Sequence, residues 1–136
     1  MMHPLKISIV QTDIAWENKQ ENLRMLREKL HALRGTTEIV VLPEMFSTGF
    51  TMKSRELAEP VSGITVRILK ELAADFQLAL CGSFICSERS NYYNRAFFIT
   101  PEGEEFYYDK RHLFRMGNEA EDFSAGNNKL IISYRG

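Results

Sequence analysis

Short apolar runs alternate with segments of helical periodicity in the N-terminal part of this chain, and this alternation constrains the fold more than any other sequence feature. Residues 6–11, 38–42 and 77–86 are short apolar runs, which is typical of strands. Residues 18–33 and 63–76 carry apolar side chains three or four positions apart, which predicts helices with one buried face. The order predicts an α/β layered domain in which helices cover a mixed sheet.

Local signals set the limits of these elements. Asn18 is a candidate cap for the start of the first helix, and Gly35 follows its end. Residues 46–60 have no clean period and predict a long loop with room for one short helix. The buried stripe expected for the second helix consists of Ile68, Leu69, Leu72, Ala73 and Phe76.

The C-terminal part reads as strands and loops. Residues 93–100 and 105–108 predict two strands of a hairpin, because a Pro-Glu-Gly turn signal separates them. Residues 109–128 are polar and loop-like, and residues 130–134 predict a last strand.

Length and charge narrow the class of protein. A chain of 136 residues with 44% hydrophobic residues supports one domain, residues 1–136, with a single core. The net charge of −1 and the absence of a basic face argue against a nucleic-acid partner.

The compartment follows from what the sequence lacks. No run approaches the ~18 apolar residues of a membrane span, and no signal peptide is visible, so we expect a cytoplasmic protein with no membrane partner. Cys81 and Cys86 fit a reduced compartment and match no common zinc spacing. Both lie in an apolar run, which predicts buried, unreactive thiols.

Glu44 and Lys110 are the first candidates for chemistry. Glu44 stands just past the carboxyl end of a predicted strand, where open α/β sheets place their ligands. A carboxylate that is partly withdrawn from water and held at a rigid position after Pro43 is suited to act as a general base. Lys110 lies between two aromatic stretches and could stabilise an oxyanion or pair with Glu44. Read one at a time, each also fits an ordinary charge at a strand exit.

Three further polar residues carry weaker signals. Glu119 follows Lys110 in a polar segment, where a solvated carboxylate is the ordinary reading. His112 fits a hydrogen-bonded structural histidine better than a general base. Asp13 fits turn capping better than a pocket lining.

Taken together, two motifs resemble the nitrilase superfamily of carbon–nitrogen hydrolases. They are Leu42-Pro43-Glu44-Met45-Phe46 and Tyr108-Asp109-Lys110-Arg111-His112-Leu113-Phe114, and segments around Gly82-Ser83, Tyr93-Asn94 and Phe123-Ser124 also match. The resemblance spans nearly the whole chain. Residues 115–119 look most like the bacterial ω-amidase branch.

The resemblance implies an αββα sandwich, a Glu-Lys-Cys mechanism and a homodimer or higher homo-oligomer. By resemblance, Glu44 is the general base, Lys110 stabilises the oxyanion, and Glu119 is the second glutamate that positions substrate. Phe50 and Phe114 are expected to line the substrate pocket, with core packing as a near-equal alternative. The implied substrate is a small linear amide, and neither a metal nor a cofactor is required.

This chain departs from the family pattern at the nucleophile. The family's cysteine follows one more strand, and the sequence ends at Gly136 before that point. No residue matches the nucleophile, so we expect the chain to be inactive alone and the αββα sandwich to be incomplete at its C-terminus.

Two other functions remain open from the sequence. One is a truncated, non-catalytic homologue that acts as a binding or oligomerisation module. The other is a metal-dependent phosphoesterase, which would need a cluster of Asp, Asn and His ligands around a hard cation. Asp13, Glu44 and His112 are too few to favour it.

Overall fold

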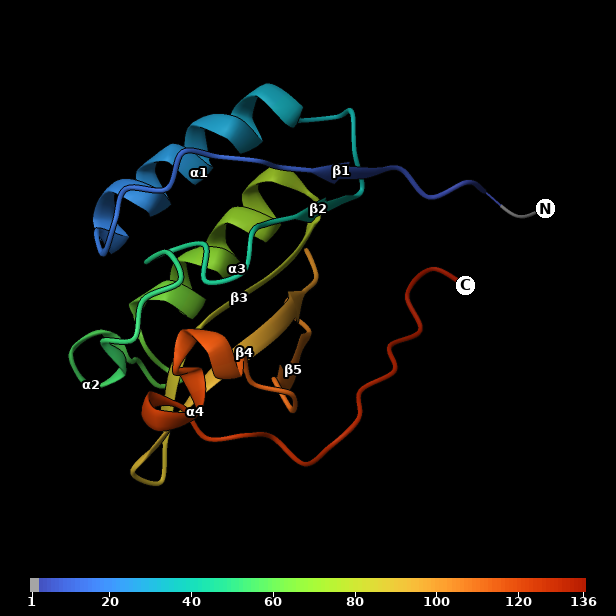
Figure 1. The fold of residues 1–136 in the computed structure, drawn as a ribbon. Coiled ribbons are helices and arrows are strands. Elements are labelled where there is room, and N and C mark those ends of the chain that lie inside the picture. Colours follow the sequence, from blue (N-terminus) through green and yellow to red (C-terminus); the bar gives the residue numbers. More distant parts are fainter. Residues whose placement is uncertain (1–2) are drawn as a thin grey trace.

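A mixed sheet of five strands organises the computed structural model, which describes residues 3–136 (Figure 1). The strands are β1 (Ile7–Ile9), β2 (Ile39–Val41), β3 (Ala79–Glu88), β4 (Asn91–Ile99) and β5 (Glu105–Asp109). The helices are α1 (Lys19–Leu33), α2 (Ser54–Leu57), α3 (Ile64–Phe76), the 3₁₀ turn η1 (Arg115–Gly117) and α4 (Glu119–Asp122).

The strands lie in sequence order, β1-β2-β3-β4-β5. β1, β2 and β3 are parallel, and β3-β4 and β4-β5 are antiparallel hairpins. Because both parallel crossovers step in the same direction, the usual right-handed connection puts α1 and α3 on the same face of the sheet, as Figure 1 shows. Among the described residues no helix is long and apolar enough to cross a membrane.

Helices α1 and α3 bury the faces that the sequence predicts. The Asn18 side chain accepts a hydrogen bond from the Glu21 amide and caps α1, and Gly35 has the positive φ expected just after the helix end. The side chains that pack between the two helices and the sheet form one core. It includes Leu23, Leu26, Leu30, Val40, Leu69, Leu72, Phe76, Leu80 and Phe97.

The prediction of a last strand at residues 130–134 is wrong. Tyr134 packs edge-on against Phe98, with 5.2 Å between the ring centroids, and the Arg135 guanidinium lies 2.9 Å from a carboxylate oxygen of Glu38. These side-chain contacts hold the segment beside the sheet, but among residues 3–136 its backbone pairs with no strand, and Ile131 is 96% exposed. An apolar run without a partner backbone does not form a strand.

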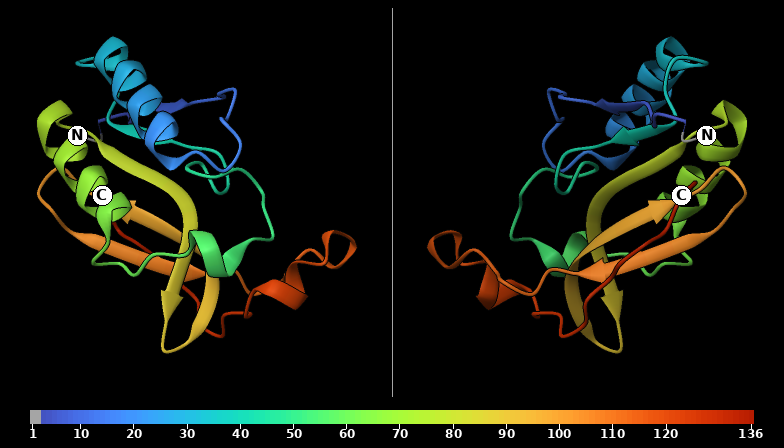
Figure 2. Two further views of the ribbon diagram at one scale, coloured as in Figure 1. Left: turned by 90° about the vertical axis from the view of Figure 1, so that its left-hand side faces the viewer. Right: turned by 90° about the vertical axis from the view of Figure 1, so that its right-hand side faces the viewer.

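One loop prediction needs adjustment and another is confirmed. Residues 109–128 are not a plain loop, because they contain η1 and the single turn α4, which project beyond the end of the sheet (Figure 2). The expected short helix within residues 46–60 is present as α2.

Within residues 3–136 no long helix covers the second face of the sheet, and only the short helices α2 and α4 approach it, at one end. Side chains alternate along each strand, so Ile9, Val41, Cys81, Ala96 and Phe98 point away from α1 and α3. Ile9 is 78% exposed on this face. We call it the open face, and the candidate site lies along it.

Packing between α3 and the sheet gives a direct test of the core. We expect Leu72→Ala to lower the free energy of unfolding by about 2–5 kcal/mol, because Leu72 is fully buried and a cavity would remain. Ile64, also on α3 but half exposed, is the matched control, and Ile64→Ala should cost less than about 1 kcal/mol. Chemical denaturation of both variants measures the difference. Equal losses would contradict this placement of α3.

Candidate active site

Glu44 projects from a tight turn immediately after β2. The next residue, Met45, is fully buried with a φ of +49°, a conformation that a non-glycine residue adopts only when its surroundings hold it there. The Ser83 hydroxyl of β3 accepts a hydrogen bond from the Met45 amide at 2.8 Å, and the Ser83 carbonyl accepts one from the Phe46 amide. β3 therefore fixes the direction in which Glu44 leaves β2.

Lys110 comes directly after β5 and continues its pairing with β4. Its backbone amide donates to the Asn94 carbonyl at 3.0 Å, one step beyond the Arg95–Asp109 pair of the ladder. Its Nζ lies 2.9 Å from Glu44 Oε2, although 66 residues separate the two in sequence. The lysine and the glutamate thus meet at the open face from two different strands.

Glu119 is the first residue of α4 and is fully buried. Its carboxylate lies 3.1 Å from Lys110 Nζ and accepts hydrogen bonds from the Phe114 amide at 2.7 Å and from Asn94 Nδ2 at 3.2 Å. The sequence favoured a solvated carboxylate here by position alone, and the structure shows the opposite. Three donors around one buried carboxylate offset much of the cost of removing its charge from water.

Glu44, Lys110 and Glu119 therefore form one cluster with Lys110 between two carboxylates. Burial alone would lower the pKa of Lys110, but hydrogen bonds and charge from Glu44 and Glu119 outweigh it and raise that pKa above its ordinary value. The ammonium is thus held positive. A fixed cation beside a carboxylate that is about half exposed can stabilise a developing negative charge while the carboxylate takes up a proton.

Both predicted pocket residues lie beside this cluster. Lys110 Nζ sits 5.3 Å from the centre of the Phe50 ring, and Phe114 packs edge-on against Phe50 at 6.3 Å. A Cβ on Gly117 would come within 2.7 Å of the Phe114 ring, so glycine permits this approach. All five residues proposed from the sequence are gathered at one place, while their roles stay predictions.

A hollow of about 340 Å³ opens beside Glu44, Asn94 and Lys110 on the open face. Its walls are almost entirely apolar, so charged groups occupy one side of a hydrophobic cleft. The remaining lining residues are Val41, Leu42, Cys81, Gly82, Ser83, Ala96 and Tyr108.

Neither cysteine offers a thiolate at neutral pH. Burial raises the pKa of the Cys81 thiol, and it raises that of Cys86 to about 11. We expect native Cys86 to react with a thiol reagent at pH 8 at least about a hundredfold more slowly than a free cysteine, with Cys81 faster because it is partly exposed. Reaction of the native and the denatured protein with a chromogenic disulfide measures both rates. Fast native labelling of Cys86 would contradict its burial.

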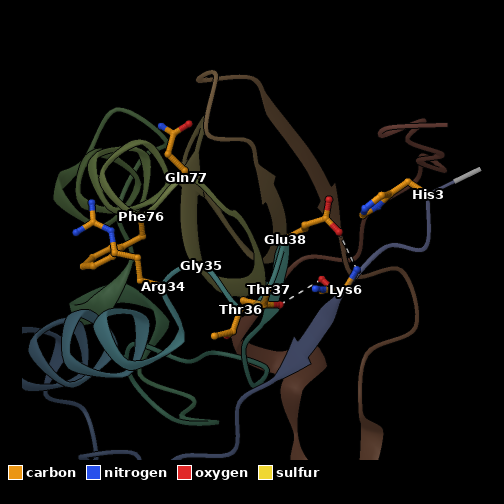
Figure 3. Close-up of a pocket in the computed structure, with 9 residues that line it drawn as sticks. All are labelled: His3, Lys6, Arg34, Gly35, Thr36, Thr37, Glu38, Phe76 and Gln77. Atoms are coloured by element: carbon orange, nitrogen blue, oxygen red, sulfur yellow. Dashed lines mark hydrogen bonds between the residues drawn. The ribbon is translucent and has the colours of Figure 1, made fainter.

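A second hollow, of about 370 Å³, lies at the opposite ends of the parallel strands (Figure 3). Several of its polar groups already have partners: the Lys6 amide donates to Glu38, and Arg34 lies over the Phe76 ring and donates to the Asp75 carbonyl. No group of polar side chains there resembles the Glu-Lys-Glu cluster.

Metal-binding potential is absent from the described residues. Within residues 3–136 no three His, Cys, Asp or Glu side chains gather so that they could hold a metal ion. Asp13 and His112 are both exposed and make no hydrogen bond to Glu44. The donor set that a metal-dependent phosphoesterase would need is not assembled.

Sequence reasoning missed Asn94 and Ser83 as parts of the site. Asn94 is 2% exposed and donates to both glutamates, and Ser83 holds the Glu44 turn. One signal could have found Asn94. A hairpin turning at residues 101–103 pairs Ile99 with Glu105, and counting back along both strands brings Asn94 beside Lys110.

Comparison with known proteins agrees with this fold. The sequence profile described as carbon–nitrogen hydrolase matches residues 6–131. The chain is 33% identical over 135 residues to the Escherichia coli (strain K12) omega-amidase YafV, covering 99% of this chain and 52% of the relative. It is 28% identical over 134 residues to an (R)-stereoselective amidase of a Pseudomonas species, covering 97% of this chain and 48% of that protein.

Solved structures give the same result. The crystal structure of XC1258 from Xanthomonas campestris, a CN-hydrolase superfamily protein with an arsenic adduct in its active site, superposes with a TM-score of 0.94 at 37% identity and covers 98% of this chain and 50% of that one. An amidase of Nesterenkonia AN1 shares the fold at 19% identity, with a TM-score of 0.83, and covers 97% of this chain and 53% of that one.

The architecture is thus that of an α/β protein with the carbon–nitrogen hydrolase fold, as the sequence predicted. The chain belongs to the carbon–nitrogen hydrolase family, which is the nitrilase superfamily. It spans about half the length of the curated relatives that it matches.

Proposed function

We propose that this chain forms the acid–base and oxyanion-binding part of an amidase active site. The observation that carries the proposal is the cluster in which Lys110 Nζ lies 2.9 Å from Glu44 and 3.1 Å from the buried Glu119. Omega-amidase and stereoselective amidase relatives support the same class of reaction.

The proposed chemistry divides the work between three side chains and a cysteine outside residues 1–136. Glu44 takes the proton of the cysteine thiol, and the thiolate attacks the amide carbon. Lys110 stabilises the oxyanion of the tetrahedral intermediate. The C–N bond then breaks, ammonia leaves with the proton that Glu44 held, and water hydrolyses the thioester. Glu119 fixes Lys110 and the Phe114 backbone beside the substrate.

The proposed substrate is the ω-amide of a small keto or amino dicarboxylate. Phe50 and Phe114 do not line the hollow beside Glu44, but both lie on the Lys110 side of the cluster and would form a further wall of the substrate pocket. A cytoplasmic location and a homodimer also stay predictions.

A second candidate function has one observation in its favour. The open face carries exposed apolar side chains, including Ile7 and Ile9, which suits a non-catalytic binding or oligomerisation module. We expect residues 1–136 alone to show no amide hydrolysis. Light scattering with and without small amides tests the module: oligomers larger than a dimer that form without any response to amide would favour it.

A chimeric polypeptide tests the amidase proposal. Residues 1–136 would be joined to the C-terminal half of the Escherichia coli omega-amidase, which covers the other part of the relative's length. We expect ammonia release from ω-amides by the chimera and none by either half alone. A chimera that unfolds cooperatively but releases no ammonia from any short ω-amide would defeat the proposal.

A further inference from the structure

Asn94 makes the same two contacts as Lys110. Its Nδ2 lies 2.8 Å from Glu44 Oε2 and 3.2 Å from Glu119 Oε2. Lys110 Nζ lies 2.9 Å and 3.4 Å from these same two oxygens. The Asn94 amide and the Lys110 ammonium thus each contact both carboxylates, and of these four groups only the amide is uncharged.

The orientation of the Asn94 amide is forced by its surroundings. A flipped side chain would place its carbonyl oxygen against two carboxylates, whereas the NH₂ group has one hydrogen for each of them. The side chain is 2% exposed, so water cannot take the place of either partner. The bridge is therefore built from the folded chain alone.

The backbone of Asn94 adds a third contact with the site. Its carbonyl accepts the Lys110 amide at 3.0 Å, next to the regular β4–β5 ladder. One residue therefore fixes the main chain of Lys110 and also touches both carboxylates that Lys110 contacts. Its side chain is short and projects from the middle of a sheet, so holding it in one conformation costs little conformational entropy.

Glu44 and Glu119 differ in how firmly they are held. Glu119 is fully buried and also accepts the Phe114 amide. The Glu44 side chain is 47% exposed, and within residues 3–136 its carboxylate contacts only Asn94 and Lys110. Two carboxylates near one cation repel each other, so the more exposed one would otherwise turn toward water.

We infer that Asn94 is a positioning residue that bridges Glu44 to the buried Glu119 and thereby holds Glu44 against Lys110. The inference rests on the proposed function for its catalytic meaning, while the bridge itself is a property of the fold. Because the amide is neutral, it fixes both carboxylates without supplying a second positive charge that would compete with Lys110 at the oxyanion.

The pKa of Lys110 reports the bridge without any catalysis. NMR of protein labelled with ¹³C at lysine Cε follows the titration, and Lys110→Arg identifies the resonance. We expect Asn94→Ala to lower the pKa of Lys110 by about 1, because Glu44 turns away and its charge is lost from the ammonium. If Asn94 only competes with Lys110 for the carboxylates, its removal would leave that pKa unchanged or raise it, and the inference would be overturned.

The matched control is Asn91→Ala. Asn91 begins the same strand and is exposed, and among the described residues its side-chain amide contacts only the Arg89 carbonyl and Ser124. The control should leave the Lys110 titration unchanged. An equal decrease in both variants would assign the effect to β4 as a whole and overturn the role of Asn94.

A second measurement keeps Asn94 intact, in case Asn94→Ala fails to fold. The two side-chain amide protons of Asn94 have separate resonances, and each points to a different glutamate. We expect Glu44→Gln to move one of them and Glu119→Gln to move the other. If neither resonance responds, the bridge does not exist in solution. An intact bridge in a chimera that hydrolyses no amide would defeat the proposed function and leave this inference standing.

Discussion

Glu44→Gln in a polypeptide that supplies the cysteine nucleophile is expected to lower kcat for amide hydrolysis by about 10²–10⁴-fold. Glutamine preserves the size of the side chain and can still contact Lys110, but it cannot take the thiol proton. KM should change much less, because Glu44 reaches the hollow from one side and most of the wall is apolar. Ammonia release at several substrate concentrations separates the two effects.

Lys110→Ala in the same polypeptide should have an effect of similar size. Removing the ammonium takes a charge from the position where the oxyanion forms, and loss of one such donor costs about 10²–10³-fold in kcat. Lys53→Ala is the matched control, since Lys53 is an exposed lysine that also pairs with a glutamate, Glu17. Activity that survives Lys110→Ala would refute the proposed role of this cluster.

The Lys110 ion pair can also be tested through the stability of the protein, without any catalysis. Lys110→Met is expected to lower the free energy of unfolding at pH 7 by about 3 kcal/mol, because it leaves the buried Glu119 carboxylate without its cation. Lys53→Met removes an exposed partner of Glu17 and should cost about 0–1 kcal/mol. Urea denaturation of both variants compares the two ion pairs directly.

The difference in stability between wild type and Lys110→Met should change with pH in one direction. The folded protein raises the pKa of Lys110 above its ordinary value, so the charged lysine contributes its full stability below that ordinary value. The contribution is lost as the pH rises through the folded pKa, where the wild-type side chain also becomes neutral. We therefore expect the gap between wild type and Lys110→Met to stay constant from neutral pH to about pH 9 and to narrow above about pH 10. A gap that widens with pH would contradict this assignment.

Local pattern predicted most of the secondary structure. The leucine spacing of residues 18–33 and the stripe of residues 63–76 placed both long helices to within a residue, because burial of one face imposes a 3.6-residue period. The turn at Pro101–Gly103 placed the β4–β5 hairpin. Pattern failed at residues 130–134, where an apolar run has no partner backbone.

At the candidate site, the local sequence pattern predicted only part of the arrangement. Two motifs named Glu44 and Lys110. Position alone made Glu119 a solvated loop carboxylate, and only the resemblance gave it a role, while Asn94 matched the family pattern without being assigned one. Contacts between Lys110 and Glu44 and between Asn94 and Glu44 join residues 66 and 50 positions apart. No local signal records a contact at that distance along the chain.

The sequence by itself determined the family, the order of helices and strands, and the two motifs that supply Glu44 and Lys110. These follow from short-range periodicity, turn chemistry and residue identity. Only the tertiary structure decided that Glu119 is fully buried, that Asn94 bridges both carboxylates, and that residues 130–134 form no strand. The reason is physical: burial and hydrogen bonding depend on which distant segments meet, and the register of β3, β4 and β5 sets that meeting.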